Sequence, residues 1–252
     1  MGESIKRIVG PYQDSYSPNG IIGEKDACGV GFIANIKGVE SNWILKQSLK
    51  GLNCMEHRGG CGGDSDSGDG AGILCSIPWG YLEEKINLKN IQEFDRGLGM
   101  VFMPNKKEKI EICKSICDEE AEKLKVNKTS WRTVPVNNEI LGPLAKANAP
   151  FICQWILYIN KKDHQDVERL LFQLRKRIEK KIRETFKNDI GDCEFYFASL
   201  SSQTVVYKCM FLSEILSDFY QDLKEESFKV SFSVYHRRFC LLYTSPSPRD
   251  RG

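Results

Sequence analysis

Apolar residues recur along the chain at two spacings, every second position and every third or fourth position. Alternation predicts half-buried strands, and the longer period predicts amphipathic helices. The predicted strands cover residues 29–36, 73–77, 98–103, 130–136, 151–159, 194–200, 204–208 and 229–239. The predicted helices cover residues 41–55, 106–125 and 164–186, with a short one at 212–220. Long helices between strand pairs that look antiparallel indicate a layered α+β domain.

Individual positions in this pattern carry specific expectations. Val30, Phe32 and Ile36 alternate, which predicts that they turn one face of the first strand toward a core. Ser41 precedes the first apolar helical stripe and is therefore expected to cap that helix. Cys113 and Cys117 are four apart in the second helix, with no second pair that would complete four zinc ligands, so core packing is expected for both.

Composition restricts the class of protein. A chain of 252 residues with 41% hydrophobic residues can bury one substantial core, which predicts one globular domain. The charges nearly cancel, with 36 Lys and Arg against 34 Asp and Glu, so no nucleic acid partner is expected. No run approaches the roughly 20 apolar residues of a membrane span, so no membrane association is expected either.

The ten cysteines do not indicate a disulfide framework. The chain is large for such a scaffold, residues 1–27 lack the apolar core of a secretory signal, and the cysteines are scattered among apolar positions. Most are expected to be reduced, buried thiols.

Two ligand motifs are present only in part. Gly29, Gly31 and Ala34 have dinucleotide-loop spacing, but they open a strand instead of following one into a helix. The acidic run at 64–68 has a cysteine, Cys75, where a calcium loop needs its bidentate glutamate. Neither a dinucleotide nor a calcium ion is therefore expected, and no metal site is assigned.

Two longer segments carry a family resemblance. DACGVGFIANIKG at 26–38 and CMEHRGGCGGDSDSGDGAGIL at 54–74 resemble, in order and spacing, the start of the class II amidotransferase domain of the glutamate synthase family. The second segment is most similar to the ferredoxin-dependent members. SLSSQTVVYK and HRRF, further along, are also similar, so the resemblance spans residues 20–239.

The resemblance implies a fold and a set of site residues. The fold is a four-layer αββα sandwich of the N-terminal-nucleophile hydrolases, incomplete at its C-terminal end. Residues 1–27 would be a leader whose removal makes Cys28 the first residue and the catalytic nucleophile. Arg238 would bind the substrate carboxylate, and His57, Arg58 and Gly59 would support the site. The family's oxyanion-hole Asn-Gly pair would lie beyond HRRF.

The resemblance also implies a reaction and partners. The substrate would be L-glutamine, hydrolysed to glutamate and ammonia at a glutaminase domain covering residues 28–239. FMN and an iron–sulfur cluster would be bound in the full-length enzyme, with none in this part, and ferredoxin would be the electron donor. The compartment would be the plastid stroma in a eukaryote or the cytoplasm in a bacterium. Without the oxyanion hole and the downstream domains, the chain itself is expected to be inactive.

Residues 240–252 break the strand pattern. CLLYTSPSPRD contains two prolines and resembles a translated sequencing adapter, so we expect this tail to be foreign. Two alternatives to the leading interpretation remain open. The first is that the chain belongs to another class II amidotransferase, and the second is that it is a glutamine-binding domain without turnover.

Overall fold

The computed structural model describes residues 29–55, 67–86, 94–147, 149–160, 166–187 and 195–237, without the side chains of residues 67–69, 144 and 211. The strands are β1 (Gly29–Ala34), β2 (Ser67–Ser76), β3 (Phe94–Met103), β4 (Lys128–Thr133), β5 (Phe151–Asn160), β6 (Tyr196–Ser201), β7 (Thr204–Phe211) and β8 (Phe232–Arg237). The α-helices are α1 (Asn42–Asn53), α2 (Trp79–Ile86), α3 (Lys107–Lys123), α4 (Pro143–Ala147), α5 (Val167–Thr185) and α6 (Leu216–Phe219). Short 3-10 turns are η2 (Asn138–Ile140), η4 (Ser213–Ile215) and η5 (Gln221–Lys224).

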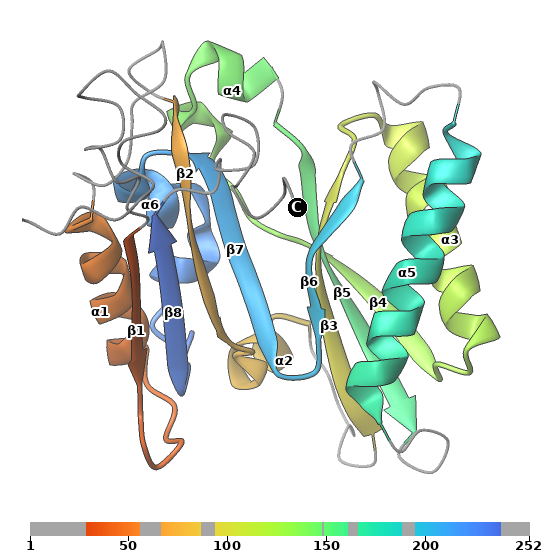
Figure 1. Cartoon of the computed structure of the whole chain (residues 1–252), viewed down its shortest axis with the longest axis horizontal. Helices are drawn as coiled ribbons and strands as arrows, with labels where there is room; N and C mark the ends of the chain where they lie inside the picture. The colour runs from red at the N-terminus through yellow and green to blue at the C-terminus, as the bar shows by residue number, and fades with distance from the viewer. Residues whose placement is uncertain are drawn as a thin grey trace, which may run out of the picture.

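The strands form two four-stranded sheets. Sheet 1 has the order β1-β8-β2-β7 and sheet 2 has the order β4-β5-β3-β6. All the described strand pairs within them are antiparallel. Strands β6 and β7 are consecutive and belong to different sheets, so the short connection between them joins sheet 2 to sheet 1 (Figure 1).

Helices α3 and α5 lie beside sheet 2, and α1 packs on the face of sheet 1 that also meets sheet 2 (Figure 1). One apolar cluster joins α3 and α5 to sheet 2 through residues such as Cys117, Trp155 and Leu171. A second cluster joins the opposite face of sheet 2 to sheet 1, α1 and α2. This arrangement confirms the predicted α+β sandwich.

The orientation predicted for the first strand is wrong. Val30 and Phe32 are 58% and 76% exposed, and Ile36 lies beyond the end of β1 and is fully exposed. The opposite face of β1 is the covered one, because Gly31 lies against the ring of Tyr235 on β8 and leaves no room for a side chain. The glycines, not the large apolar residues, therefore mark the inward face of this strand.

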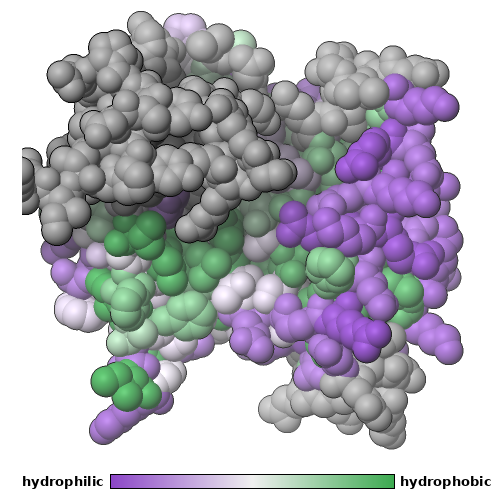
Figure 2. Space-filling model, in the orientation of Figure 1, coloured by the Kyte–Doolittle hydropathy of each residue, from purple (hydrophilic) through white to green (hydrophobic). Residues whose placement is uncertain are grey.

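Phe32 belongs to an apolar row that crosses the whole of sheet 1. The strand register places Phe32 opposite Val234, Val234 opposite Leu74, and Leu74 opposite Val206. Leu74, Val206 and Val234 are half-buried. Figure 2 shows hydrophobic surface over sheet 1 and hydrophilic surface over α5. In the part of the chain that the structure describes, this face of sheet 1 is thus the open one.

Most helix and strand predictions are confirmed to within a few residues, but β2 begins at Ser67, six residues before the strand predicted at 73–77, and two further details differ. Ser41 occupies the N-cap position of α1 without a side-chain capping bond. Its backbone instead pairs with Val230, and Asn42 Nδ2 donates to the carbonyls of Glu225 and Phe228. Helices α2 and α4 were not predicted.

The cysteine prediction is confirmed where the structure describes these residues. Five thiols are buried, and Cys54 is exposed. The buried thiols are Cys75, Cys113, Cys117, Cys153 and Cys209. Burial raises the pKa of Cys75 to about 12, which keeps its thiol protonated at neutral pH. Among the helices described, none is long and apolar enough to cross a membrane.

Candidate functional site

The predicted site residues lie outside the described residues. These are Cys28, His57, Arg58, Gly59 and Arg238. The structure does describe their neighbours along the chain. Cys28 is followed by Gly29, the segment with His57 and Arg58 comes shortly after Met55, and Arg238 follows Arg237. The candidate site is therefore approached through these neighbours.

The neighbours meet at one end of sheet 1. Strand β1 begins at Gly29 and β8 ends at Arg237, and these two residues are register partners. Arg237 is also the register partner of Ala71 near the start of β2. Because β8 lies between β1 and β2 and runs antiparallel to both, the starts of those two strands flank its end. Figure 1 shows this convergence at the upper end of sheet 1.

Met55 brings the end of helix α1 to the same place. Its Sδ atom lies 2.7 Å from the point where a Cβ on Gly29 would stand. A side chain at Gly29 would therefore have to displace Met55, so the backbone at the start of β1 lies directly against the second residue after α1. We use the term junction for a group of four residues, Gly29, Met55, Gly70 and Arg237.

Arg237 occupies the centre of the junction. Its side chain is fully buried, and Nη1 donates to the carbonyl oxygen of Gly70 at 2.9 Å. Gly70 has a φ of +93°, a conformation that strains residues with a side chain. The register of β2 against β7 shifts between Ser67 and Ala71. The arginine thus reaches the backbone where regular pairing of β2 with β7 is interrupted.

His236 precedes this arginine on the opposite face of β8. Burial lowers the pKa of His236 from its ordinary value, so the imidazole is neutral at pH 7. Of these two neighbours, Arg237 is the one whose side chain is fully buried. Arg237 lies within the HRRF motif, but sequence reasoning selected Arg238 and missed the buried role of its neighbour.

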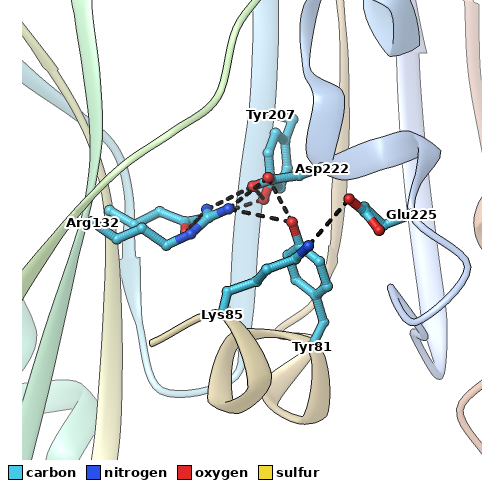
Figure 3. Close-up of polar contacts among 7 residues, drawn as sticks. Tyr81, Lys85, Arg132, Tyr207, Asp222 and Glu225 are labelled. Carbon is cyan, nitrogen blue, oxygen red and sulfur yellow. Dashed lines mark hydrogen bonds and ion pairs between the residues drawn. The ribbon is translucent and has the colours of Figure 1, made fainter. Parts of the chain in front are cut away.

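A second polar cluster lies deep between the sheets (Figure 3). Asp222 on η5 is fully buried and accepts two bonds of 2.7 Å from Arg132 on β4, one to each carboxylate oxygen. It also accepts bonds from the hydroxyls of Tyr81 on α2, at 2.7 Å, and Tyr207 on β7, at 3.2 Å. Gln154 on β5 donates to the Tyr207 hydroxyl and accepts from Arg132.

The protonation states of this cluster make it a structural element. Burial and the hydrogen bond to Asp222 raise the pKa of Tyr81, and burial raises that of Tyr207. Burial opposes the charge on Arg132, but Asp222 outweighs it and raises the pKa of that guanidinium. All three groups keep their protons near neutral pH and are held by partners, so the cluster fastens β4, β5, β7, α2 and η5 together without offering an acid or a base.

Metal ligation was not predicted. In the described ranges, no three His, Cys, Asp or Glu residues are grouped so that they could hold a metal ion.

Comparison with known proteins gives a consistent family. A model of the class-II glutamine amidotransferases matches residues 28–249. The chain is 42% identical over 243 residues to "Ferredoxin-dependent glutamate synthase, chloroplastic" of Oryza sativa subsp. japonica, covering 95% of this chain and 15% of that protein. It is 42% identical over 223 residues to "Ferredoxin-dependent glutamate synthase 2" of Synechocystis, covering 87% and 14%. For the Pyropia yezoensis protein, "Ferredoxin-dependent glutamate synthase", identity is 40% over 242 residues, covering 95% and 16%. The chain spans about 15% of the length of such relatives.

Proposed function

Because the chain belongs to the class-II glutamine amidotransferase family, we propose that it is part of the glutaminase domain of a ferredoxin-dependent glutamate synthase. The observation that carries the proposal is the convergence of Gly29, Met55 and Arg237 at one end of sheet 1. Cys28 and Arg238 are bonded directly to the register partners Gly29 and Arg237. The family match also begins at Cys28.

Cys28 is the proposed nucleophile, after removal of residues 1–27. A thiol with a pKa of about 8.5 needs a base, and a free α-amine with a pKa of about 7.7–8.0 on the same residue accepts its proton. Before cleavage that nitrogen is an amide and cannot do so. Maturation at the Ala27–Cys28 bond therefore creates the base as well as the new end of the chain.

The reaction proceeds in two steps. The thiolate attacks the side-chain carboxamide carbon of glutamine, and the resulting tetrahedral oxyanion collapses, with protonation of the leaving nitrogen, to release ammonia and leave a γ-glutamyl thioester. Water then attacks the thioester, and glutamate leaves as the thiol is restored. In the same proposal Arg238 binds the α-carboxylate of glutamine through its planar guanidinium. His57, Arg58 and Gly59 support the site.

The released ammonia would aminate 2-oxoglutarate in the rest of the full-length enzyme. FMN, an iron–sulfur cluster and ferredoxin as electron donor belong to that larger protein in this proposal. Its compartment would be the plastid stroma in a plant or alga, or the cytoplasm in a bacterium. The chloroplastic and cyanobacterial relatives support this assignment.

The test uses the protein expressed from its full-length gene. Intact mass and N-terminal sequencing should show a chain that begins at Cys28, and Cys28→Ala should abolish glutamate release from glutamine. The matched control is Cys54→Ala, which removes the exposed thiol after α1 and should retain activity. An active enzyme that still begins at Met1, or an active Cys28→Ala variant, would overturn the proposal.

A further inference from the structure

Arg237 is an unusual residue to find at the end of a central strand. It is among the largest side chains that the structure buries completely, and arginine is seldom buried unless its charge is compensated. The side chain points to the same face of β8 as Ser233, which is also buried. A methionine or leucine would fill such a place at lower cost, so packing alone does not account for a guanidinium.

The guanidinium reaches a backbone position that the sheet does not hold by itself. Gly70 adopts a left-handed conformation next to the register shift in β2. Nη1 of Arg237 bonds to the carbonyl of Gly70 from a residue 167 positions away. The bond therefore holds the first half of β2 against the last residue of β8.

The same arginine is tied through its backbone to the start of β1. Gly29 and Ala71 flank Arg237 as its two register partners. Met55 packs on Gly29 from the end of α1. Loss of the guanidinium would therefore release the start of β2 from the end of β8, directly beside the place where β1 begins.

We propose that Arg237 is a positioning residue of the glutaminase site, holding in register the strand ends from which Cys28 and Arg238 continue. The inference rests on the proposed function. Arg237 touches neither substrate nor reacting atoms in this role. It acts by fixing the distance between the nucleophile and the group that binds the carboxylate of glutamine.

The test compares Arg237→Gln and Arg237→Lys with Arg132→Lys in the full-length enzyme. Arg132 is a second deeply placed arginine, but it lies in the cluster between the sheets and not at the junction. Three quantities are measured for each variant. They are the melting temperature, the kcat and KM for glutamine hydrolysis, and the rates of Cys28 alkylation by iodoacetamide and by a chloromethyl ketone analogue of glutamine.

The two alkylating agents separate positioning from general damage. Iodoacetamide needs only the thiolate, whereas the glutamine analogue needs the thiolate and the carboxylate anchor in register. Arg237→Gln should slow the analogue, and lower kcat/KM, by about tenfold or more. Its reaction with iodoacetamide should stay within about twofold of wild type, and Arg237→Lys should recover part of the loss. Arg132→Lys should lower the melting temperature and leave the ratio of the two alkylation rates unchanged.

One outcome would overturn the proposal that Arg237 is a positioning residue. If Arg237→Gln and Arg237→Lys lower the melting temperature but keep kcat/KM and both alkylation rates within about twofold of wild type, Arg237 is only structural. Failure of the proposed function is seen separately, because Cys28→Ala would then retain glutaminase activity whatever the Arg237 variants do.

Discussion

Tyr235 lies between two glycines that admit no side chain. A Cβ on Gly31 would stand 2.4 Å from the ring and its hydroxyl oxygen, and one on Gly51 would stand 2.6 Å from that oxygen. These glycines let α1, β1 and β8 approach one another through a single aromatic ring. The close approach also fixes which face of β1 is covered.

Gly51→Ala should therefore destabilise the protein even though it lies in a helix. Overpacking of this kind costs about 1–3 kcal/mol, more than the gain of about 0.5–1 kcal/mol that alanine gives over glycine within a helix. Unfolding in urea, followed by circular dichroism, measures the change.

Gly80 provides the matched control for that substitution. It lies in helix α2 with open space where a Cβ would stand. Gly80→Ala should leave stability unchanged or raise it. Equal stability changes for Gly51→Ala and Gly80→Ala would contradict the packing assigned to Tyr235.

At the scale of elements, helices α3 and α5 are joined by a buried carboxylate. Glu120 on α3 bonds to Lys123 at 2.6 Å and to Arg177 on α5 at 2.8 Å. The bond from Lys123 is the largest influence that lowers the pKa of Glu120 below 4.5, while burial opposes it. Because the folded state holds this proton less tightly than the unfolded state, the stabilisation is present above the ordinary pKa and is lost as pH falls through the lowered one.

The contribution of Glu120 to stability should therefore be lost on acidification. Wild type should lose more stability than Glu120→Gln between about pH 5 and pH 3, and the two should converge at the acid end. Glu111→Gln is the control, since the side chain of Glu111 is 65% exposed and its pairing with Lys114 on the same helix spans 3.7 Å. Urea midpoints measured across this range provide the comparison, and parallel curves for Glu120→Gln and wild type would refute the prediction.

The cluster around Asp222 unites more elements than any ion pair on the surface. Asp222→Asn leaves Arg132, whose side chain is only 12% exposed, without its charged partner, which should cost up to about 3–5 kcal/mol. Lys85→Met removes the neighbouring pair with Glu225, which Figure 3 shows beside the cluster and whose side chains are 40% and 45% exposed. That change should cost less than about 1 kcal/mol. Thermal unfolding of both variants tests this difference in stability. A melting temperature of Asp222→Asn equal to that of wild type would contradict the prediction.

The local pattern of apolar residues was sufficient to predict the long helices and strands, but it was insufficient to predict the cluster around Asp222. The apolar stripe of α5 and the alternation in β5 depend on residues close in sequence, so period alone located them. Arg132 and Asp222 are 90 residues apart, and each reads locally as a polar position on the surface. The orientation of β1 failed for a related reason, because Gly31 leaves room for a tyrosine that lies some 200 residues further along the chain.

The candidate site also has a part that the sequence predicts and a part that only the structure shows. Short motifs and a family resemblance selected Cys28, Arg238 and the HRGG segment, and these assignments stay predictions. The structure adds the junction that adjoins them, in which Arg237 bonds to Gly70. No periodicity within HRRF distinguishes a buried arginine from an exposed one at the end of a strand.

At the scale of the whole molecule, the open face of sheet 1 departs from an ordinary protein surface in the residues that the structure describes. Phe32 at 76% exposure and Met210 at 55% lie on strands at its two edges. Apolar sheet faces left open promote association. We expect this chain, expressed alone, to self-associate.

Phe32→Lys should reduce that association with little change in stability. Light scattering against protein concentration measures it, with Phe172→Lys as the control. Phe172 is 61% exposed but lies on the charged face of α5, so its replacement should have little effect. Equal solubility of the two variants would show that the face of sheet 1 is not responsible.

Among the strands that the structure describes, β1 pairs with one neighbour in sheet 1, which is β8. Roughly 200 residues separate them in the chain. During synthesis at about 5–20 residues per second, β1 leaves the ribosome some 10–40 s before its partner exists. The nascent chain must hold its N-terminal strand unpaired for that interval. Any processing that depends on a folded start of β1, such as the cleavage proposed above before Cys28, would therefore be delayed until β8 has been translated.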